Sequence, residues 1–352
     1  MVNVGIAGIG FMGVTHFDAY AKVRGAQVAA ICTRSQAKLD GDWSTVQGNF
    51  GDAGGKRDLG EIARYRDFAD LIPHPSLDLI SICLPTPQHV DETLAALEAG
   101  KHVVVEKPIA LTVDAADRMI AAAKANDRLL MVAQVLRFWP QWRYLKSLVA
   151  ERTFGKLVAL NLTRIIAVPD WSKEMADLGA NGGPLIDLHI HDVDFILYLL
   201  GKPKRVHTIG RERGNAVIYV ASTYDFGGDD APIVSCQSGA AATRGRPFMH
   251  SFDACFERAT VRFSQATEPA GNDPASRRSA SQVLTVSHAD KRIEHPQFDQ
   301  TDGFVPQMQH VVDCVASNRQ SDVIAAQSAR DSLALVYLEA ESARSRAQVD
   351  VP

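Results

Sequence analysis

The stretch VNVGIAGIGFMG, residues 2–13, decides the fold of the first part of the chain. The apolar run Val2–Ala7 predicts a strand, and Val14–Val23 is typical of a helix. Between them stands the pattern G-x-G-x-x-G, in the strand–turn–helix setting that a dinucleotide-binding turn requires. A second apolar run, Gln27–Cys32, completes a βαβ unit. The sequence therefore predicts a nucleotide-binding turn where the first strand meets its helix.

The three glycines of this turn have different physical roles. Gly8 permits the tight turn, Gly10 lets the backbone approach a pyrophosphate, and Gly13 lets the helix lie close to the strand. Backbone N–H groups and the helix dipole would then hold the phosphates. We expect the turn to contact a dinucleotide through Gly8, Gly10, Phe11, Met12 and Gly13. The alternative is a glycine-rich turn that binds no ligand.

The end of the second strand indicates which dinucleotide is bound. An Asp or Glu at this point would accept a hydrogen bond from the ribose 2′-hydroxyl of NAD. The chain has Thr33, Arg34 and Ser35 there, so no carboxylate repels a 2′-phosphate, and a cation and two hydroxyls are available to hold one. These three residues are expected to bind the cofactor, and NADP is favoured over NAD. The alternative is that Arg34 only stacks on the adenine, which either cofactor allows.

Strands and helices continue to alternate as far as residue 133. The predicted elements are the strand Leu77–Leu84, a helix from about Gln88 to Ala99, the strand His102–Val105, the helix Val113–Ala125 and the strand Leu129–Ala133. This alternation predicts a parallel, doubly wound sheet that binds ligands at the carboxyl ends of its strands. The polar, glycine-rich residues 40–60 interrupt the pattern and are interpreted as an inserted loop.

The pattern changes after residue 135. The predicted elements are the helix Trp139–Glu151, the strand Lys156–Ile166, the helix Leu185–Leu200 and the helices Phe304–Val315 and Ala325–Ser345. Several short alternating runs between residues 206 and 263 indicate an open, mostly antiparallel sheet. The fold class is therefore α/β, with a doubly wound Rossmann domain at 1–135 and an α/β substrate and oligomerisation domain at 136–352. We expect the last helix, about 325–345, to pack back on the first domain, and the open sheet to form a homodimer or homotetramer.

Bulk properties exclude several classes of protein. At 352 residues the chain is longer than a single hydrophobic core supports, which favours two domains. Its net charge of −4 argues against partners such as nucleic acid or an anionic membrane. No apolar run approaches the roughly 20 residues of a membrane span, the start has no basic segment typical of a signal peptide, and the five cysteines are scattered. We therefore expect a cytoplasmic protein.

A second stretch, LIDLHIHDVDF at residues 185–195, concentrates histidines and aspartates. On a helix that turns about 100° per residue, Asp187, His191 and Asp194 share a face, whereas His189 points to the opposite side. The two imidazoles therefore diverge, and no metal site is expected. A histidine beside a carboxylate can take up a hydroxyl proton at neutral pH. Asp187 and His191 are thus a candidate proton-transfer pair, with a structural role at a helix start as the alternative.

Two further motifs complete the pattern. They are Glu106-Lys107-Pro108 after a predicted strand, and Gly182-Gly183-Pro184-Leu185-Ile186-Asp187 with His191 four residues on. Together with the N-terminal glycines they resemble the glucose–fructose oxidoreductase/inositol dehydrogenase/MocA (Gfo/Idh/MocA) family, over nearly the whole chain. The resemblance implies an oxidoreductase that uses NAD or NADP on a carbinol of a sugar, cyclitol or related polyol. It also implies that Lys107, Asp187 and His191 form the catalytic set.

The resemblance further implies where the ligands bind. The pair Thr86-Pro87 matches the family's cofactor loop, and Glu106 lies on the cofactor side. The expected cofactor contacts in this region are Leu84, Thr86, Pro87, His89, Glu106 and Lys107. The candidate substrate contacts, which flank the expected cleft in sequence order, are Arg137, Arg164, Asp170 and Trp171. Each of these four has a packing role as its alternative.

The chain departs from the family pattern in three places. His189 occupies a position that is usually small, the loop at 40–60 is longer than is typical, and neither asparagine nor histidine stands just before Arg137. These differences concern the substrate rather than the chemistry. Three other functions are weighed against the dehydrogenase: a cofactor-binding regulator without catalysis, a hydrolase or lyase that uses the nicotinamide transiently and, least favoured, a zinc hydrolase.

Overall fold

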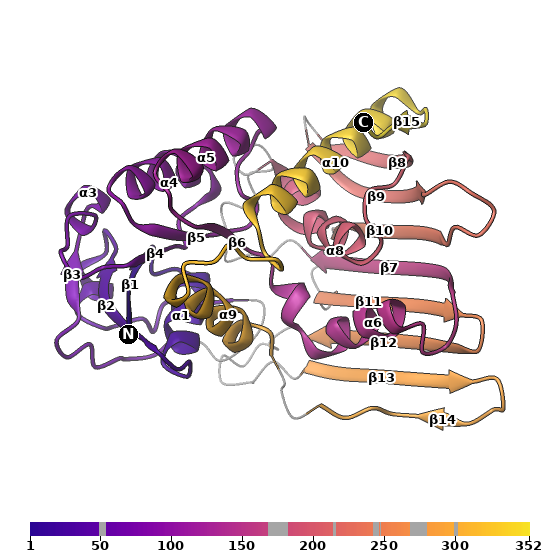
Figure 1. Cartoon of the computed structure of the whole chain (residues 1–352), viewed down its shortest axis with the longest axis horizontal. Helices are drawn as coiled ribbons and strands as arrows, with labels where there is room; N and C mark the ends of the chain where they lie inside the picture. Colours follow the sequence, from indigo (N-terminus) through magenta and orange to yellow (C-terminus); the bar gives the residue numbers. More distant parts are fainter. Residues whose placement is uncertain are drawn as a thin grey trace. The chain divides into compact units, whose positions relative to one another are not determined.

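Parallel strands form the first sheet, in the order β3-β2-β1-β4-β5-β6. The strands are β1 (Val2–Ala7), β2 (Ala26–Cys32), β3 (Ala63–Tyr65), β4 (Leu79–Ile82), β5 (His102–Glu106) and β6 (Leu130–Ala133). Strands β4 and β6 are buried along their whole length, as is typical of a parallel sheet covered on both faces. Helices α4 (His89–Glu98) and α5 (Val113–Ala125) cover one face, and α1 (Phe11–Tyr20) and α9 (Phe304–Ala316) cover the other (Figure 1). The predicted doubly wound parallel sheet is confirmed.

The chain forms two units. The computed structural model describes residues 1–48, 54–167, 182–213, 216–241, 246, 248–267, 280–298 and 302–352. Within these, the first unit comprises Met1–Gly48, Asp52–Phe138 and Asp302–Asp331, and the second consists mainly of Trp139–Thr301 and Ser332–Pro352. Shorter elements of the first unit are α2 (Gln36–Leu39), α3 (Phe68–Leu71), η1 (Thr86–Gln88) and η2 (Val135–Phe138).

The second unit is built on a nine-stranded sheet, in the order β14-β13-β12-β11-β7-β10-β9-β8-β15. Its strands are β7 (Leu157–Ala167), β8 (Arg205–Arg213), β9 (Ala216–Asp225), β10 (Ile233–Ala241), β11 (Phe248–Phe256), β12 (Ala259–Thr267), β13 (Ala280–His288), β14 (Ile293–Glu294) and β15 (Val349–Asp350). The pair β7–β10 is parallel and the other pairs are antiparallel, which confirms the predicted mostly antiparallel sheet. Helices α6 (Pro140–Glu151), α8 (Ile190–Leu200) and the second part of α10 (Ala326–Ser345) lie over one face (Figure 1).

One aromatic side chain anchors α6 and α8 to the sheet. Trp142 of α6 is fully buried. Its ring centroid lies 4.7 Å from that of Phe195 on α8, 5.3 Å from Phe252 on β11 and 6.3 Å from Phe263 on β12. These edge-to-face contacts make Trp142 the centre of the apolar layer between helices and sheet. No helix among the described residues has the length and apolar character needed to cross a membrane.

The C-terminal helices are divided between the units. Helix α9 belongs to the first unit, where Gln309 exchanges hydrogen bonds with the backbone N and O of Arg24 at 2.8 and 3.1 Å. The unit boundary falls inside α10, between Asp331 and Ser332. The sequence pattern predicts a second domain that contains all residues after 135, with the helix at 325–345 packing back on the first domain. In the structure, α9 packs on the first unit, and the first residues of α10 also belong to that unit, where Arg330 pairs with Asp117 of α5 at 2.8 Å.

The described part of the insertion at residues 40–60 packs against α1. Trp43 is fully buried, and its ring centroid lies 4.8 Å from that of Phe17. Arg57 forms an ion pair with Asp18 at 3.0 Å. These contacts explain why a polar, glycine-rich segment is tolerated between two strands, because its apolar side chains Trp43, Val46 and Leu59 are buried in the first unit.

A buried ion pair joins α1 to the end of β5. His16 and Glu106 are both buried, and His16 Nε2 lies 3.0 Å from Glu106 Oε1. The Nδ1 atom of the same ring lies 2.8 Å from Ser81 Oγ and 3.3 Å from Cys83 Sγ. Burial by itself disfavours the imidazolium, but Cys83 and the Glu106 carboxylate raise the pKa of His16 to about 10. His16 is therefore charged at neutral pH and ties α1 to β5.

This ion pair predicts how stability depends on pH. The folded chain keeps a proton on His16 that the unfolded chain loses near pH 6.5. The stabilising contribution is therefore complete below pH 6.5 and is lost as the pH rises to about 10. We expect the free energy of unfolding, measured with urea, to fall across this window in the wild type. The fall should be smaller in the double variant His16→Gln, Glu106→Gln, which leaves no buried charge without its partner.

A matched control is available in the second unit. His207→Gln, at a partly exposed histidine of β8, should leave the pH dependence of the wild type unchanged. An equal fall in the wild type and the His16, Glu106 double variant would contradict the charged state assigned to His16.

Candidate functional site

The glycine turn has the shape of a phosphate-binding site. Gly8 has a φ of 92°, a left-handed conformation that favours glycine, and a Cβ there would lie 2.6 Å from the carbonyl oxygen of Cys83. A Cβ on Gly13 would lie 1.9 Å from the oxygen of Gly8, whereas one on Gly10 would meet nothing within 4 Å. Helix α1 starts at this open position without a side-chain cap or an acidic residue in its first turn. This helix end therefore suits an anion such as a pyrophosphate.

The end of β2 carries the predicted residues and one that the sequence analysis missed. Arg34 is exposed, Thr33 and Ser35 are half-buried, and the Ser35 side chain caps α2. Arg66, which follows β3, donates to the backbone oxygen of Arg34 at 3.4 Å. Two guanidinium groups therefore stand at this end of the sheet. Arg66 would have been found if Ala63–Tyr65 had been recognised as a strand, because β3 is the parallel neighbour of β2.

One histidine holds the loop after β4. Thr86 is buried at the start of η1, Leu84 is half-buried and Pro87 is exposed. His89 is buried, and its two ring nitrogens lie 2.8 Å from the oxygen of Pro108 and 2.9 Å from the oxygen of Leu84. Both ring nitrogens therefore contact the backbone, and the expected contact of His89 with a cofactor stays a prediction. Its contacts connect the loop after β4 to the turn after β5.

The turn after β5 holds Lys107 between two fixed neighbours. Glu106 accepts a hydrogen bond from the backbone N–H of Lys107 at 3.2 Å, while its other oxygen contacts His16. Pro108, joined to Lys107 by a cis peptide bond, is held by His89. Lys107 itself is half-buried at the carboxyl end of its strand, where sheets of this kind bind ligands. Both oxygens of Glu106 have contacts inside the unit that support Lys107, and its expected contact with a cofactor stays a prediction.

In the second unit, the stretch 185–195 begins as a π-helix. Gly182 and Gly183 have φ values of 75° and 71°, and a Cβ on Gly182 would lie 2.7 Å from Cδ1 of Ile186. These glycines let the chain enter η3 (Leu185–His189), which continues as α8. The sequence pattern predicts one regular α-helix over Leu185–Leu200. The first turn is wider, so the spacing of 100° per residue applies only from Ile190 onwards.

Burial separates the polar side chains of this stretch into two groups. Asp187 and His191 are half-buried, whereas His189 and Asp192 have no exposed surface. The expected separation of His189 from an accessible pair Asp187–His191 therefore agrees with the burial pattern. Asp194 is 1% exposed, so it does not share the accessible face as the helical spacing suggested.

The candidate catalytic residues come from both units. Lys107 belongs to the first unit, and Asp187 and His191 belong to the second. Each lies on a segment that leaves its side chain partly accessible: the turn after β5, and the start of η3 and α8. The assembly of the three residues into one site belongs to the function proposed below.

The candidate substrate residues have other partners. Arg164 is 3% exposed, and its Nε and Nη2 donate to the two carboxylate oxygens of Asp192 at 2.8 and 2.9 Å. Arg137 is 4% exposed and donates to a backbone oxygen of its own unit. Both arginines therefore have partners inside their own units, and the expectation that they contact substrate stays a prediction. Asp170 and Trp171 lie outside the described residues.

Two family profiles match the chain, one in each unit. Residues 2–134 match the profile described as "Oxidoreductase family, NAD-binding Rossmann fold". Residues 142–257 match the profile "GFO/IDH/MocA C-terminal domain". The first match contains the glycine turn and Lys107, and the second contains Asp187 and His191.

Several curated proteins are similar in sequence. Myo-inositol 2-dehydrogenase of Thermotoga maritima is 28% identical over 201 residues, which cover 57% of this chain and 55% of that protein. The scyllo-inositol 2-dehydrogenase (NADP(+)) of Bacillus subtilis is 27% identical over 68% of this chain and 70% of its own. Trans-1,2-dihydrobenzene-1,2-diol dehydrogenase of Sus scrofa is 32% identical over 49% of each chain. The match spans about half the length of most of these relatives.

Solved structures share the fold over the whole chain. The aldose–aldose oxidoreductase of Caulobacter crescentus, solved with glycerol, has a TM-score of 0.80 at 20% identity and covers 99% of both chains. A levoglucosan dehydrogenase in complex with NADH and levoglucosan has a TM-score of 0.76 at 21% identity and covers 100% of this chain and 99% of its own. At these identities the likeness concerns the fold alone. Because both units match profiles of one family, in the expected order, the chain belongs to the Gfo/Idh/MocA oxidoreductase family.

Proposed function

We propose that the chain transfers hydride between a nicotinamide dinucleotide and a carbinol or carbonyl carbon of a sugar, cyclitol or related polyol. One observation carries the proposal: Lys107 and the glycine turn lie at the same edge of one parallel sheet, after β5 and β1. The lysine therefore stands where a bound dinucleotide would present its reactive end. The curated relatives, which are named as inositol, sugar or diol dehydrogenases and reductases, support the substrate class.

Three side chains would divide the work at the reacting oxygen. His191 would accept the hydroxyl proton during oxidation, and Asp187 would orient its ring and stabilise the imidazolium. The ammonium group of Lys107 would stabilise the alkoxide that develops as the proton leaves. The nicotinamide, when bound, supplies or accepts the hydride. In the reverse direction Lys107 would polarise the carbonyl and His191 would donate the proton.

The catalytic assignment predicts the behaviour of two variants. With the polyol that the wild type uses best, Lys107→Ala and His191→Asn should each lower kcat by roughly 10²- to 10⁴-fold, because each removes charge stabilisation or proton transfer in the transition state. Reduced nicotinamide, followed by its ultraviolet absorbance, measures the rate. The matched control is Lys124→Ala, at an exposed lysine of α5, which should retain wild-type activity.

The same assay separates the competing functions. A wild type that binds the dinucleotide but turns over no member of a broad polyol panel would favour a regulator. Product formation without net reduction of the cofactor would favour a hydrolase or lyase that uses the nicotinamide transiently. Retention of wild-type activity by Lys107→Ala would refute the role given to the lysine.

We propose further that NADP is preferred to NAD. Arg34 is exposed at the end of β2, and Arg66 is held beside it by bonds to the backbone oxygen of Arg34 and to Gln36, so two guanidinium groups stand at the end of the strand where a 2′-phosphate would bind. Arg34→Ala should raise the KM for NADP by roughly 10- to 100-fold, the effect of losing a charge-assisted hydrogen bond, and change the KM for NAD little. The control is Arg64→Ala, at an exposed arginine of β3. A wild type that uses NAD more than about tenfold better than NADP would contradict this preference.

We propose finally that the second sheet forms the contact of a homodimer or homotetramer. Ile209 of β8 and Ile233 of β10 are 69% and 73% exposed. Their neighbours Thr208 and Val234 are fully buried, so the two isoleucines project from the face opposite the helices. Light scattering should give the mass of an oligomer for the wild type and of a monomer for Ile209→Asp, Ile233→Asp. The control Lys124→Asp should stay oligomeric, and a monomeric wild type would exclude the proposal.

A further inference from the structure

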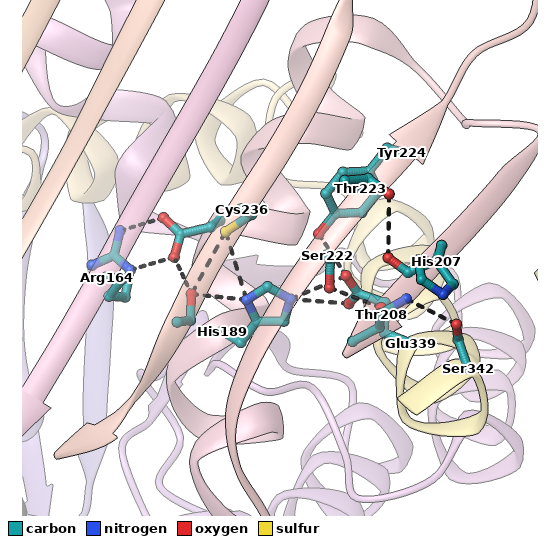
Figure 2. A network of polar contacts seen from close by, with 12 residues as sticks. Arg164, His189, His207, Thr208, Ser222, Thr223, Tyr224, Cys236, Glu339 and Ser342 are labelled. Carbon is teal, nitrogen blue, oxygen red and sulfur yellow. Dashed lines mark hydrogen bonds and ion pairs between the residues drawn. The ribbon is translucent and has the colours of Figure 1, made fainter. Parts of the chain in front are cut away.

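His189 is fully buried although it lies between two accessible polar residues, Asp187 and His191. Figure 2 shows the network of polar contacts around its ring. His189 Nδ1 lies 2.8 Å from Ser238 Oγ of β10, and Nε2 lies 3.1 Å from each carboxylate oxygen of Glu339 on α10. The ring therefore bridges the sheet and the last helix of the chain.

The directions of the hydrogen bonds fix the charge of this ring. Ser238 donates its hydroxyl proton to Asp192 at 3.2 Å, so its oxygen is the acceptor for Nδ1–H of His189. A carboxylate accepts only, so Nε2 of His189 donates to Glu339. Both ring nitrogens are therefore protonated. The pKa direction agrees: burial opposes the charge, but the Glu339 carboxylate and Cys236 together outweigh burial and hold the pKa of His189 well above its ordinary value.

The groups around this cation complete each other's hydrogen bonds. Tyr224 of β9 donates to Glu339 at 2.5 Å, and Arg164 of β7 forms the fork on Asp192 of α8 (Figure 2). Two buried cations thus stand against two buried carboxylates. The network joins η3 and α8 to strands β7, β9 and β10 and to α10.

The same atoms do not form a metal site. Ligand atoms of His189, Asp192 and Cys236 lie within 4.8 Å of one another. Both nitrogens of His189 carry protons in the network, however, and both oxygens of Asp192 accept from the guanidinium of Arg164. A metal ion would need these lone pairs and would meet a buried cation. The cluster is an ion-pair network rather than a set of ligands.

We propose that the His189–Glu339 ion pair is a positioning device, which holds the π-helical turn so that Asp187 and His191 act on one substrate oxygen. The proposal rests on the function given above for these two residues. Two left-handed glycines precede the turn, and the π-helix lacks the α-helical register, so local backbone rules define it weakly. The buried hydrogen bonds of His189 fix the conformation of this turn. His189 touches no reactant and acts through its neighbours.

A second contact ties the same segment to the same helix. Ser332 of α10 donates to Asp194 of α8 at 3.0 Å, and Ser332, Glu339 and Ser342 are all fully buried along one side of α10. Ser342 accepts from the backbone N–H of Thr208 on β8 at 2.9 Å, which anchors the end of the helix to the sheet (Figure 2). The position of α10 therefore determines the position of the π-helical turn, because Glu339 and His189 connect the two.

The experiment compares one disruptive variant with one that removes both charges. In His189→Gln, kcat should fall by roughly 10- to 100-fold, because small displacements of catalytic groups have effects of this size. The KM for the nicotinamide cofactor should stay within about twofold of the wild type. Hydrogen–deuterium exchange should become faster in the peptide that spans residues 185–195. Tyr224→Phe, which removes one hydrogen bond from Glu339, should give a smaller change in the same direction.

The double variant His189→Leu, Glu339→Leu separates positioning from stability. Replacing a buried ion pair by apolar side chains often restores stability that is lost when one partner alone is removed. We expect its urea midpoint to recover relative to His189→Leu, while kcat stays low and exchange in 185–195 stays fast. Recovery of kcat together with stability would overturn the proposal, because the pair would then act only through stability.

A matched control lies on the same helix. Arg344 of α10 pairs with Glu212 of β8 at 3.0 Å, and both side chains are about half exposed. Glu212→Gln should leave kcat and exchange at wild-type values. If the wild type oxidises no polyol, the proposed function fails, whereas the exchange data still test the positioning. Unchanged exchange in His189→Gln would refute it independently.

Discussion

Neighbouring parallel strands end at one edge of a sheet, and the first unit depends on this constraint. The glycine turn follows β1, Arg34 follows β2, Thr86 follows β4 and Lys107 follows β5, and these four strands are neighbours in the sheet. Residues up to about a hundred positions apart are thus brought to one edge by backbone hydrogen bonding alone. The side chains there need no contact with each other to share a ligand, because the strands already fix their spacing.

Each unit supports its candidate catalytic residues with a buried histidine–carboxylate pair. His16 and Glu106 stand beside Lys107, and His189 and Glu339 stand beside Asp187 and His191. In both pairs burial opposes the charge, and a neighbouring cysteine and the carboxylate together outweigh it and raise the pKa of the imidazole. Removing one partner of such a pair leaves a buried charge and costs roughly 3–5 kcal/mol. The accessible catalytic candidates are therefore held by buried pairs. A substitution in one of these pairs destabilises the fold more than a substitution at an accessible residue.

The sequence correctly predicts the features that depend on local sequence pattern and hydrophobic periodicity. The element Val113–Ala125 has the same bounds in prediction and structure, and the fingerprint glycines have the conformations that their roles require. Strand β3 was missed because three residues give no periodic signal, and with it Arg66 was missed. Strand β13 was also missed: the polar stretch before it was extended over Ala280 and Ser281, and the alternating residues 282–288 were given no element. The π-helix was missed because its residues have an ordinary helical pattern, and only the glycines before it indicate an unusual entry.

Contacts between residues far apart in the sequence could not be predicted, and this limited the prediction of the candidate site. Arg164 looked like a substrate ligand because its partner Asp192 lies 28 residues away, and His189 had no evident role because Glu339 lies 150 residues away. Helical spacing predicted which way His189 points, but not what it meets. A polar residue that points into the interior needs buried hydrogen-bond partners. For His189 these partners hold a charged imidazole under the π-helical turn. Because the His189 side chain points into the interior, it does not reach the substrate. Its buried bonds instead hold the backbone of the two neighbouring residues, Asp187 and His191, in position.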